Sequence, residues 1–271
     1  MLTAAAPVRQ QPRAASMAVS PVLSVVLPAR NEAAGIQTSV RTVDTFLAGL
    51  GLSYEIIVGD SGSDDGTGAL ASNLGLPQVR VVRVDEPGKG LILGHAMSRA
   101  HGSVIAFLDS DLEISVEQLG PAISAVLAGS DAAIGSKALN AEFAASRTRT
   151  RRVMTAVANR LIRLALGTRL SDHQAGMKVF RSEALLPVLP RVRSTGWLWD
   201  TELLATMCAS GASIVEIPVT TTPSRPSRLI SMRQIFSAGR ELIEICTRVR
   251  LHRWSKSLRA VTRAGELLPA G

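Results

Sequence analysis

The chain has 271 residues, of which 46% are apolar and 3% are aromatic, and its formal net charge is +8. This length and apolar content suit one α/β enzyme domain with appendages. No run reaches the ~18–20 apolar residues that a membrane-spanning helix needs, and two cysteines without metal-ligand spacing fit a reduced, cytosolic setting.

Residues 1–20 are rich in Ala, Pro, Ser, Gln and Arg and lack the apolar stretch of a signal peptide, so we expect a disordered leader. The next part of the chain alternates strand and helix patterns. The expected strands are 23–27, 54–58, 79–84 and 104–108, and the expected helices are 34–50, 67–74 and 91–100, with a loop at 87–90. This order predicts an α/β fold, in which a mostly parallel sheet has helices on both faces and binds ligands at the carboxyl ends of its strands.

The second half of the chain is less regular. We expect helices at 115–127, with Ser115 as N-cap, at 148–166 and at 200–210, and strands at 132–136, 177–180 and 213–219. The segment 229–254 is amphipathic, and its apolar stripe includes Leu242, Ile243, Cys246 and Val249. Residues 221–271 carry ten Lys/Arg against three Asp/Glu. The sequence therefore divides into a leader (1–20), an α/β domain (21–222) and a basic amphipathic helical tail (223–271).

Acidic side chains follow three of the expected strands. Glu32 follows the first, Asp60 the second, and Asp109, Asp111 and Glu113 the fourth. The carboxyl ends of parallel strands lie side by side, so these like charges converge and call for a hard cation, Mg²⁺ or Mn²⁺. Residues two apart in an extended stretch face the same way, which places the Asp-Ser-Asp carboxylates toward one site. Asp-x-Asp is also common in ordinary turns, but its place directly after a buried strand favours a metal and nucleotide site.

Two other stretches have both a functional and an ordinary interpretation. Asp60 could contact the base or ribose of a nucleotide, whereas turn and helix-capping chemistry explains the rest of the segment 60–67. Lys89 stands in a Pro-Gly-Lys-Gly stretch that lacks the P-loop pattern. It could meet a donor phosphate at the start of the following helix, or it could lie in a solvated loop.

Several stretches resemble the inverting family 2 glycosyltransferases of the GT-A fold. In the first half they are 25–32 (VVLPARNE), 55–67 (EIIVGDSGSDDGT) and 107–112 (FLDSDL). Later stretches resemble the polyprenyl-phosphate sugar synthases, which are the dolichol-phosphate mannose and glucose synthases: 135–137 (GSK), 172–180 (DHQAGMKVF) and 196–204 (GWLWDTELL). The resemblance implies a GT-A (Rossmann-like) fold and sugar transfer from a GDP- or UDP-linked donor. The Gln-x-x-Arg-Trp motif of the polymerising members is absent from the sequence, which favours a single transfer.

The resemblance also implies roles by position. The expected nucleotide-sugar-binding residues are Pro28, Ala29, Arg30, Glu32, Asp60, Lys89, Asp109 and Ser110, although the family often has an aromatic residue in place of Ala29 and commonly has Asp in place of Ser61. The expected metal ligand is Asp111, with Glu113 and Asp109 beside it. The expected catalytic residues are Asp111, Lys137, Asp200 and Glu202, and the acceptor phosphate is expected at Lys137, Arg151 and Arg152. Asp200 has an equally good alternative as a helix cap.

The resemblance points to a polyprenyl phosphate as acceptor. Such an acceptor is already an anion, so its transfer chemistry needs positioning and charge neutralisation more than a strong general base. A hydroxyl acceptor would need a base, and the sequence offers no unambiguous one. The tail helix could lie among the head groups of an anionic membrane, or its apolar stripe could pack on the enzyme's own core. We therefore expect a cytoplasmic enzyme, peripheral at the cytosolic face of a membrane.

Two alternatives stay open. Three stretches, 60–63, 87–90 and 109–112, also resemble the glucosyl-3-phosphoglycerate synthases, which are soluble and retaining. The other alternative is a non-catalytic module that binds a membrane surface through its basic tail. Nucleic acid is not an expected partner, because the tail lacks the interleaved aromatic residues on which bases stack.

Overall fold

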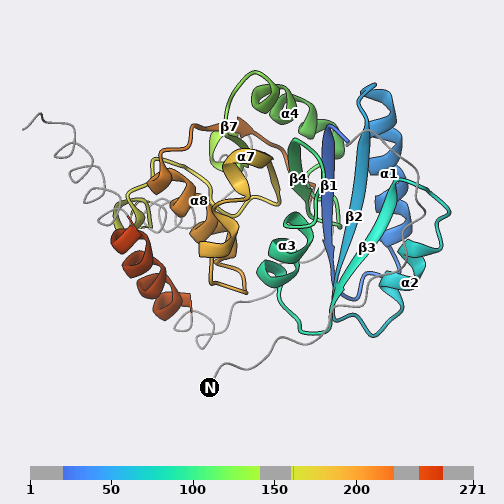
Figure 1. The fold of residues 1–271 in the computed structure, drawn as a ribbon, viewed down its shortest axis with the longest axis horizontal. Helices are drawn as coiled ribbons and strands as arrows, with labels where there is room; N and C mark the ends of the chain where they lie inside the picture. The colour runs from blue at the N-terminus through green and yellow to red at the C-terminus, as the bar shows by residue number, and fades with distance from the viewer. Residues whose placement is uncertain (1–20, 141–159, 161, 223–237, 253–271) are drawn as a thin grey trace, which may run out of the picture.

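The computed structural model describes residues 21–140, 160, 162–222 and 238–252 (Figure 1). The strands are β1 Leu23–Ala29, β2 Tyr54–Ser61, β3 Val79–Val84, β4 Val104–Leu108, β5 Ala132–Ser136, β6 Met177–Arg181 and β7 Ile214–Pro218. The α-helices are α1 Ile36–Gly49, α2 Thr67–Ser72, α3 Lys89–Met97, α4 Leu119–Leu127, α7 Ser182–Leu185 and α8 Trp199–Ser210. Short 3₁₀ turns are η1 Val116–Gln118, η2 Lys137–Leu139 and η3 Leu189–Arg191, and residues 162–166 and 238–252 are also helical.

Among the described residues, seven strands form one sheet in the order β3-β2-β1-β4-β6-β5-β7. The pairs β1–β2, β1–β4, β2–β3 and β5–β7 are parallel, whereas β6 runs antiparallel to both β4 and β5. The mostly parallel α/β sheet expected from the sequence is confirmed. Because β4 and β5 both oppose β6, they run in the same direction, so their carboxyl ends lie at the same edge as those of β1 and β2.

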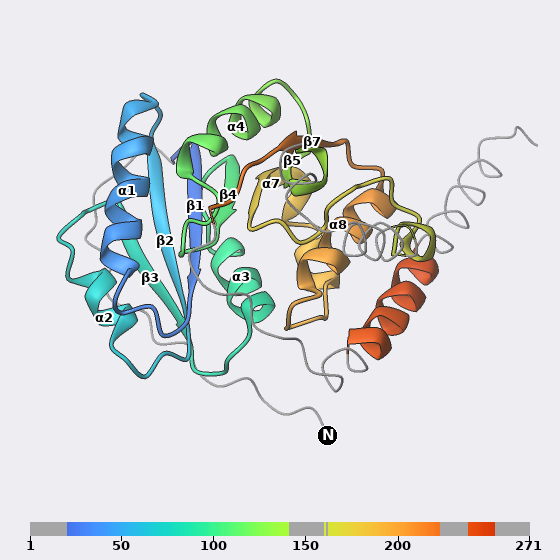
Figure 2. The same ribbon diagram turned by 180° about the vertical axis from the view of Figure 1, so that it is seen from behind.

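The central strands are apolar because both of their faces are covered, as expected for parallel strands. Alternate residues supply two separate cores. Val25 and Ile56 pack with α1, α2 and α4 on one face, whereas Val26, Ile57 and Phe107 pack with α3 and α8 on the other. Figures 1 and 2 show α1 and α2 on one side of the sheet and α3 on the opposite side. The sheet is thus a rigid platform whose loops carry the candidate site.

Several predicted boundaries differ from the structure, two of them for a tertiary reason. β1 and β2 continue to Ala29 and Ser61 because their ladder extends through the pair Ala29–Asp60. The expected loop 87–90 is half helical, because α3 begins at Lys89 and its Gly90 N–H donates to the carbonyl of Thr195, 3.0 Å away. Ser115 occupies the N-cap position of η1, but its hydroxyl makes no capping bond.

The helix 238–252 packs on the protein's own core. Ile245 and Val249 are buried against Leu198 and Ala205, the second of which belongs to α8. The predicted stripe was wrong at Ile243, which is 69% exposed, while Ile245 is fully buried in its place. A search of the helices that the structure describes finds none that is both long and apolar enough to cross a bilayer. The expected helix 148–166 lies largely outside the described residues.

Candidate active site

Four carboxylates gather where β1 and β4 end. Partial burial raises the pKa of Asp111, and the charges of Asp109, Glu113 and Glu32 raise it further, against the opposing effect of a hydrogen bond from the Glu113 backbone N–H. The structure therefore brings together four of the five acidic residues that the sequence placed at this edge, whereas the fifth, Asp60, is buried and pairs with Arg83. Their mutual repulsion makes the group around Asp111 a place where added positive charge is favourable.

Asp109 is held in position by the segment that leads into β6. Its backbone N–H donates to the carbonyl of Gly176 at 2.9 Å. A side chain at position 176 would overlap the Asp109 carboxylate, so only glycine leaves room for it. Leu112, one residue beyond Asp111, has a positive φ of 50°. A left-handed backbone is strained for a branched residue, which marks this turn as one that the surrounding structure imposes.

Lys89 is not in a solvated loop. Its Nζ lies 2.6 Å from Asp109 Oδ1 and 5.5 Å from the centre of the Phe107 ring. Burial acts to lower the pKa of Lys89, but the charges of Asp109 and Asp200 outweigh it and leave the pKa raised. Lys89 therefore stays protonated and places a positive charge directly beside the Asp-Ser-Asp turn.

A second lysine, which the sequence analysis missed as a site residue, lies on the other side of this cluster. Lys178 is fully buried, and its Nζ lies 3.2 Å from Asp200 Oδ1. The same Nζ donates a hydrogen bond to the carbonyl of Ala175 at 2.8 Å. It lies 4.9 Å from the centre of the Phe107 ring. Burial lowers the pKa of Lys178, while Asp200 opposes that shift. Two lysines thus lie near one aromatic ring, and each pairs with an aspartate. The alternation of β6 carried the signal, since it places Lys178 on the same face as buried Phe180.

Asp200 is not a helix cap. Leu198 occupies the N-cap position of α8, and Asp200 stands in the first turn with its side chain 5% exposed. Glu202 is also hidden, at 1% exposure, and its carboxylate accepts hydrogen bonds from the Arg193 and Ser194 N–H groups and pairs with Arg248. Both acids are bound within the protein.

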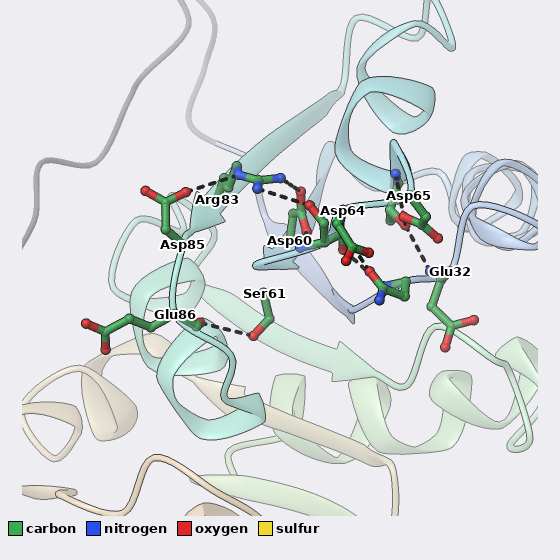
Figure 3. A network of polar contacts seen from close by, with 11 residues as sticks. Glu32, Asp60, Ser61, Asp64, Asp65, Arg83, Asp85 and Glu86 are labelled. Carbon is green, nitrogen blue, oxygen red and sulfur yellow. Dashed lines mark hydrogen bonds and ion pairs between the residues drawn. The ribbon is translucent and has the colours of Figure 1, made fainter.

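The turn after β2 is built around buried Asp60 (Figure 3). The Asp60 carboxylate accepts a bond from the Ser63 N–H at 3.0 Å and pairs with Arg83 at 2.6 Å. Arg83 also donates to the Ser63 carbonyl at 3.0 Å and pairs with Asp85 at 3.3 Å. Arg83 was not anticipated, although it faces Asp60 directly across the β2–β3 ladder. Since Asp60 is fully buried, it orders the turn from within.

The loop after β1 is joined to this same turn. The Asn31 N–H donates to Ser63 Oγ at 3.0 Å, the Glu32 N–H to Thr67 Oγ1 at 2.9 Å, and the Ala33 N–H to an Asp65 oxygen at 2.9 Å. Figure 3 shows the Glu32 carboxylate pointing away from Asp65. The two loops therefore form one ordered wall at the carboxyl edge of the sheet.

Lys137 follows β5 at this same edge. Its backbone N–H donates to Asp172 Oδ2 at 3.1 Å, and Asp172 Oδ1 accepts the Gln174 N–H at 3.0 Å. The Asp172 N–H in turn donates to Glu216 at 3.2 Å. Asp172 thus fixes Lys137 to the segment that carries Gly176.

The remaining predicted residues lie as follows. Ser110 and Ala29 are buried, Pro28 is half-buried, and Arg30 is exposed. The carbonyl of Ser110 accepts a bond from Ser39 at 2.6 Å. Arg151 and Arg152 lie outside the described residues.

The side chains around Asp111 are of the type that binds a hard cation, because they offer carboxylate oxygens. These carboxylates are close enough together to contribute to the raised pKa of Asp111. No three acidic, histidine or cysteine side chains of the part of the chain that the structure describes already converge as a complete metal site.

The family model for glycosyl transferase family 2 matches residues 24–188. The chain belongs to glycosyl transferase family 2. It is therefore a glycosyltransferase, and the expected resemblance is confirmed.

Three comparisons refine this placement. Glycosyltransferase AglD of Haloferax volcanii is 35% identical over 88% of this chain, but the chain spans only 39% of that relative's length. Polyprenol monophosphomannose synthase of Mycolicibacterium smegmatis is 32% identical, and the match covers 73% of this chain and 76% of the synthase. The glucosyl-3-phosphoglycerate synthase of Mycobacterium tuberculosis, solved with Mn²⁺, UDP and phosphoglyceric acid, superposes with a TM-score of 0.62 at 23% identity, over 84% of this chain and 78% of that one. This family 2 glycosyltransferase therefore has the GT-A fold.

Proposed function

We propose that this glycosyltransferase moves one sugar from a GDP- or UDP-linked donor to a polyprenyl phosphate at a membrane surface. The observation that carries the proposal is the pairing of an acidic cluster around Asp111 with two lysines, Lys89 and Lys137, at one edge of the sheet. The likeness to a polyprenol monophosphomannose synthase over about three-quarters of both chains supports this acceptor class.

The reaction needs little proton chemistry from the protein. An oxygen of the acceptor phosphate attacks the anomeric carbon, the bond from that carbon to the donor diphosphate breaks, and the nucleoside diphosphate departs with the electron pair. The attacking phosphate is already anionic, so positioning and charge neutralisation dominate. Because Asp200 and Glu202 are buried and bonded within the protein, we assign them positioning roles.

We assign the donor's charged groups to the residues around Asp111. A Mg²⁺ or Mn²⁺ ion held by Asp111, with Glu113 and Asp109 beside it, would neutralise the departing diphosphate. Lys89 supplies a second positive charge at Asp109. Lys137, on the same edge, is assigned to the acceptor phosphate, together with Arg151 and Arg152.

The outward face of the helix 238–252 supports a membrane location. Ile243 and Leu251 are 69% and 58% exposed, and the side chain of Arg240 is 84% exposed. Apolar and basic groups together suit the head-group region of anionic lipid, where each basic residue contributes about 1 kcal/mol. Co-sedimentation with anionic vesicles should therefore weaken in the double variant Ile243→Asp with Leu251→Asp.

The transfer itself is tested with labelled GDP-mannose and UDP-glucose, Mg²⁺ or Mn²⁺, and a short polyprenyl phosphate. We expect label in the organic phase with one donor, and none with Asp111→Ala or with EDTA. Full activity in Asp111→Ala would refute the metal assignment. If neither donor labels the lipid, polyprenyl phosphate is refuted as the acceptor.

A second candidate is transfer to 3-phosphoglycerate. It is favoured by the structural likeness to the mycobacterial synthase that was solved with phosphoglyceric acid. In the same assay with 3-phosphoglycerate, the labelled donor and the labelled product both stay in the aqueous phase, so the product is separated from the donor by anion-exchange chromatography. The anomeric configuration of that product separates a retaining from an inverting enzyme.

A further inference from the structure

We propose that the C-terminal helix 238–252 is a positioning element of the donor site, acting through the buried ion pair between Arg248 and Glu202. This inference rests on the donor site proposed above, at Lys89 and the Asp-Ser-Asp turn. It goes beyond that proposal because it assigns a role in donor binding to the C-terminal helix. That helix is more than a hundred residues away from the Asp-Ser-Asp turn in the sequence.

The first link is the ion pair itself. Glu202 Oε1 lies 2.6 Å from Arg248 Nε, and the two side chains are 1% and 29% exposed. Glu202 Oε2 accepts the N–H groups of Arg193 and Ser194 at 3.1 and 2.7 Å. An unpaired charge this deeply buried would be costly, and Arg248 places an opposite charge beside it. The helix thereby fixes the backbone at 193–194 through one side chain.

A second contact ties the same helix to the same backbone. The hydroxyl of Ser194 donates to the carboxylate of Glu241, one turn from the start of the described helix. Leu198, a few residues further on, packs against Ile245 and Val249. The segment 193–198 is therefore held along its length by residues of the C-terminal helix.

The next link joins this segment to α3. The carbonyl of Thr195 accepts the N–H groups of Gly90 and Leu91 at 3.0 and 3.2 Å. Trp199 fills the space where a side chain at Gly90 would stand, and a side chain at Gly88 would press on the Thr195 carbonyl. The start of α3 is consequently set by the position of the segment that Glu202 and Arg248 hold.

Lys89 lies between these two glycines, and its Nζ pairs with Asp109 at 2.6 Å. A path thus runs from Arg248 through the Glu202 carboxylate to the backbone at 193–195, from the Thr195 carbonyl to the start of α3, and from Lys89 to the Asp-Ser-Asp turn; ion pairs and hydrogen bonds link these segments, and the chain itself makes the short steps within them. Apolar packing alone would hold this helix to the domain. A buried ion pair usually stabilises a fold no better than apolar side chains of similar volume, so its use here suggests that it fixes the relative position of the two segments. The geometry that it fixes here is the approach of Lys89 to the donor.

The test measures binding of UDP and GDP, with Mn²⁺ present, by isothermal titration calorimetry on the full chain. We expect Arg248→Gln to weaken nucleotide binding by about tenfold, because small misplacements of a binding group have large effects. Arg248→Lys keeps a cation at Glu202 and should recover much of the affinity. The matched control is Arg240→Gln, because that side chain is 84% exposed and lies 3.8 Å from Glu244 on the same helix; its affinity should equal that of wild type.

A kinetic readout separates positioning from general loosening. In the transfer assay, Arg248→Gln should raise KM for the nucleotide sugar while KM for the acceptor stays near the wild-type value. A folded Arg248→Gln with wild-type nucleotide affinity overturns the inference alone. Wild-type protein that binds neither nucleotide overturns the donor site and the inference together. If Arg248→Gln does not fold, Ser194→Ala decides, since it removes only the bond to Glu241: a few-fold loss of affinity supports the inference, and wild-type affinity overturns it.

Discussion

Replacement of Lys178 by methionine removes a buried charge while keeping most of the side-chain volume. The ammonium of Lys178 lies 3.2 Å from Asp200 Oδ1 and 2.8 Å from the carbonyl of Ala175, and the two side chains are 0% and 5% exposed. Without it, Asp200 keeps a carboxylate in a place that water does not reach. We therefore expect a large loss of stability from a residue outside the Asp-Ser-Asp turn.

Breaking a buried pair by removing one partner costs about 3–5 kcal/mol. For a chain of this size each kcal/mol shifts the unfolding midpoint by about 2–4 °C, so Lys178→Met should lower it by about 6–20 °C. Lys89 compensates part of the stranded charge, because its own pKa is raised by Asp200. The expected loss therefore lies toward the lower end of that range.

Thermal unfolding followed by circular dichroism at pH 7.5 measures the effect. The double variant Lys178→Met with Asp200→Asn should recover most of the loss, since neither member of the pair then carries a charge. The control Arg240→Gln should unfold within about 1 °C of wild type, because exposed ion pairs contribute little. A Lys178→Met midpoint equal to that of wild type, or a double variant no more stable than the single one, would refute the charge pairing described here.

Three further changes test the site. Asp111→Asn should lower transfer by about a hundredfold yet raise the unfolding midpoint of the ligand-free protein by about 1–2 °C, because like-charge crowding is relieved; a lower midpoint contradicts this. Burial lowers the pKa of His173 from 6.5 to about 4, so below pH ~6.5 the unfolded chain takes up a proton that the native chain refuses, and stability falls toward pH ~4 by up to about 3 kcal/mol. Urea unfolding against pH should show this slope, and His173→Gln should flatten it. Gly176→Ala crowds the Asp109 carboxylate and should reduce transfer at least about tenfold, whereas Gly49→Ala in α1, with nothing within 4 Å of the added carbon, should leave transfer unchanged.

The features that the sequence predicted well are those set by local pattern. The apolar run 104–108 is a strand with those same limits in the structure, because a buried parallel strand is apolar along its whole length. The polar residue that ends such a run is equally visible. Strand ends in a parallel sheet share one edge, so Glu32 and Asp111 could be placed together before any coordinates were known.

The features that it missed depend on contacts between distant segments. The helical start of α3 at Lys89 depends on the carbonyl of Thr195, more than a hundred positions away. The burial of Ile245 in place of Ile243 follows from how the C-terminal helix is rotated, which an amphipathic pattern fixes only to about one face. Lys178 was overlooked as a site residue because a lysine inside a strand is more often solvated than buried.

The most direct test of the central claim is an acceptor competition in one tube. The wild-type protein, Mg²⁺ and a labelled nucleotide sugar are incubated with equal amounts of polyprenyl phosphate and 3-phosphoglycerate, and both products are identified by mass spectrometry. We expect one hexose added to the polyprenyl phosphate, and no such product with Asp111→Ala. Hexose found only on 3-phosphoglycerate, or lipid product formed equally by Asp111→Ala, would contradict it.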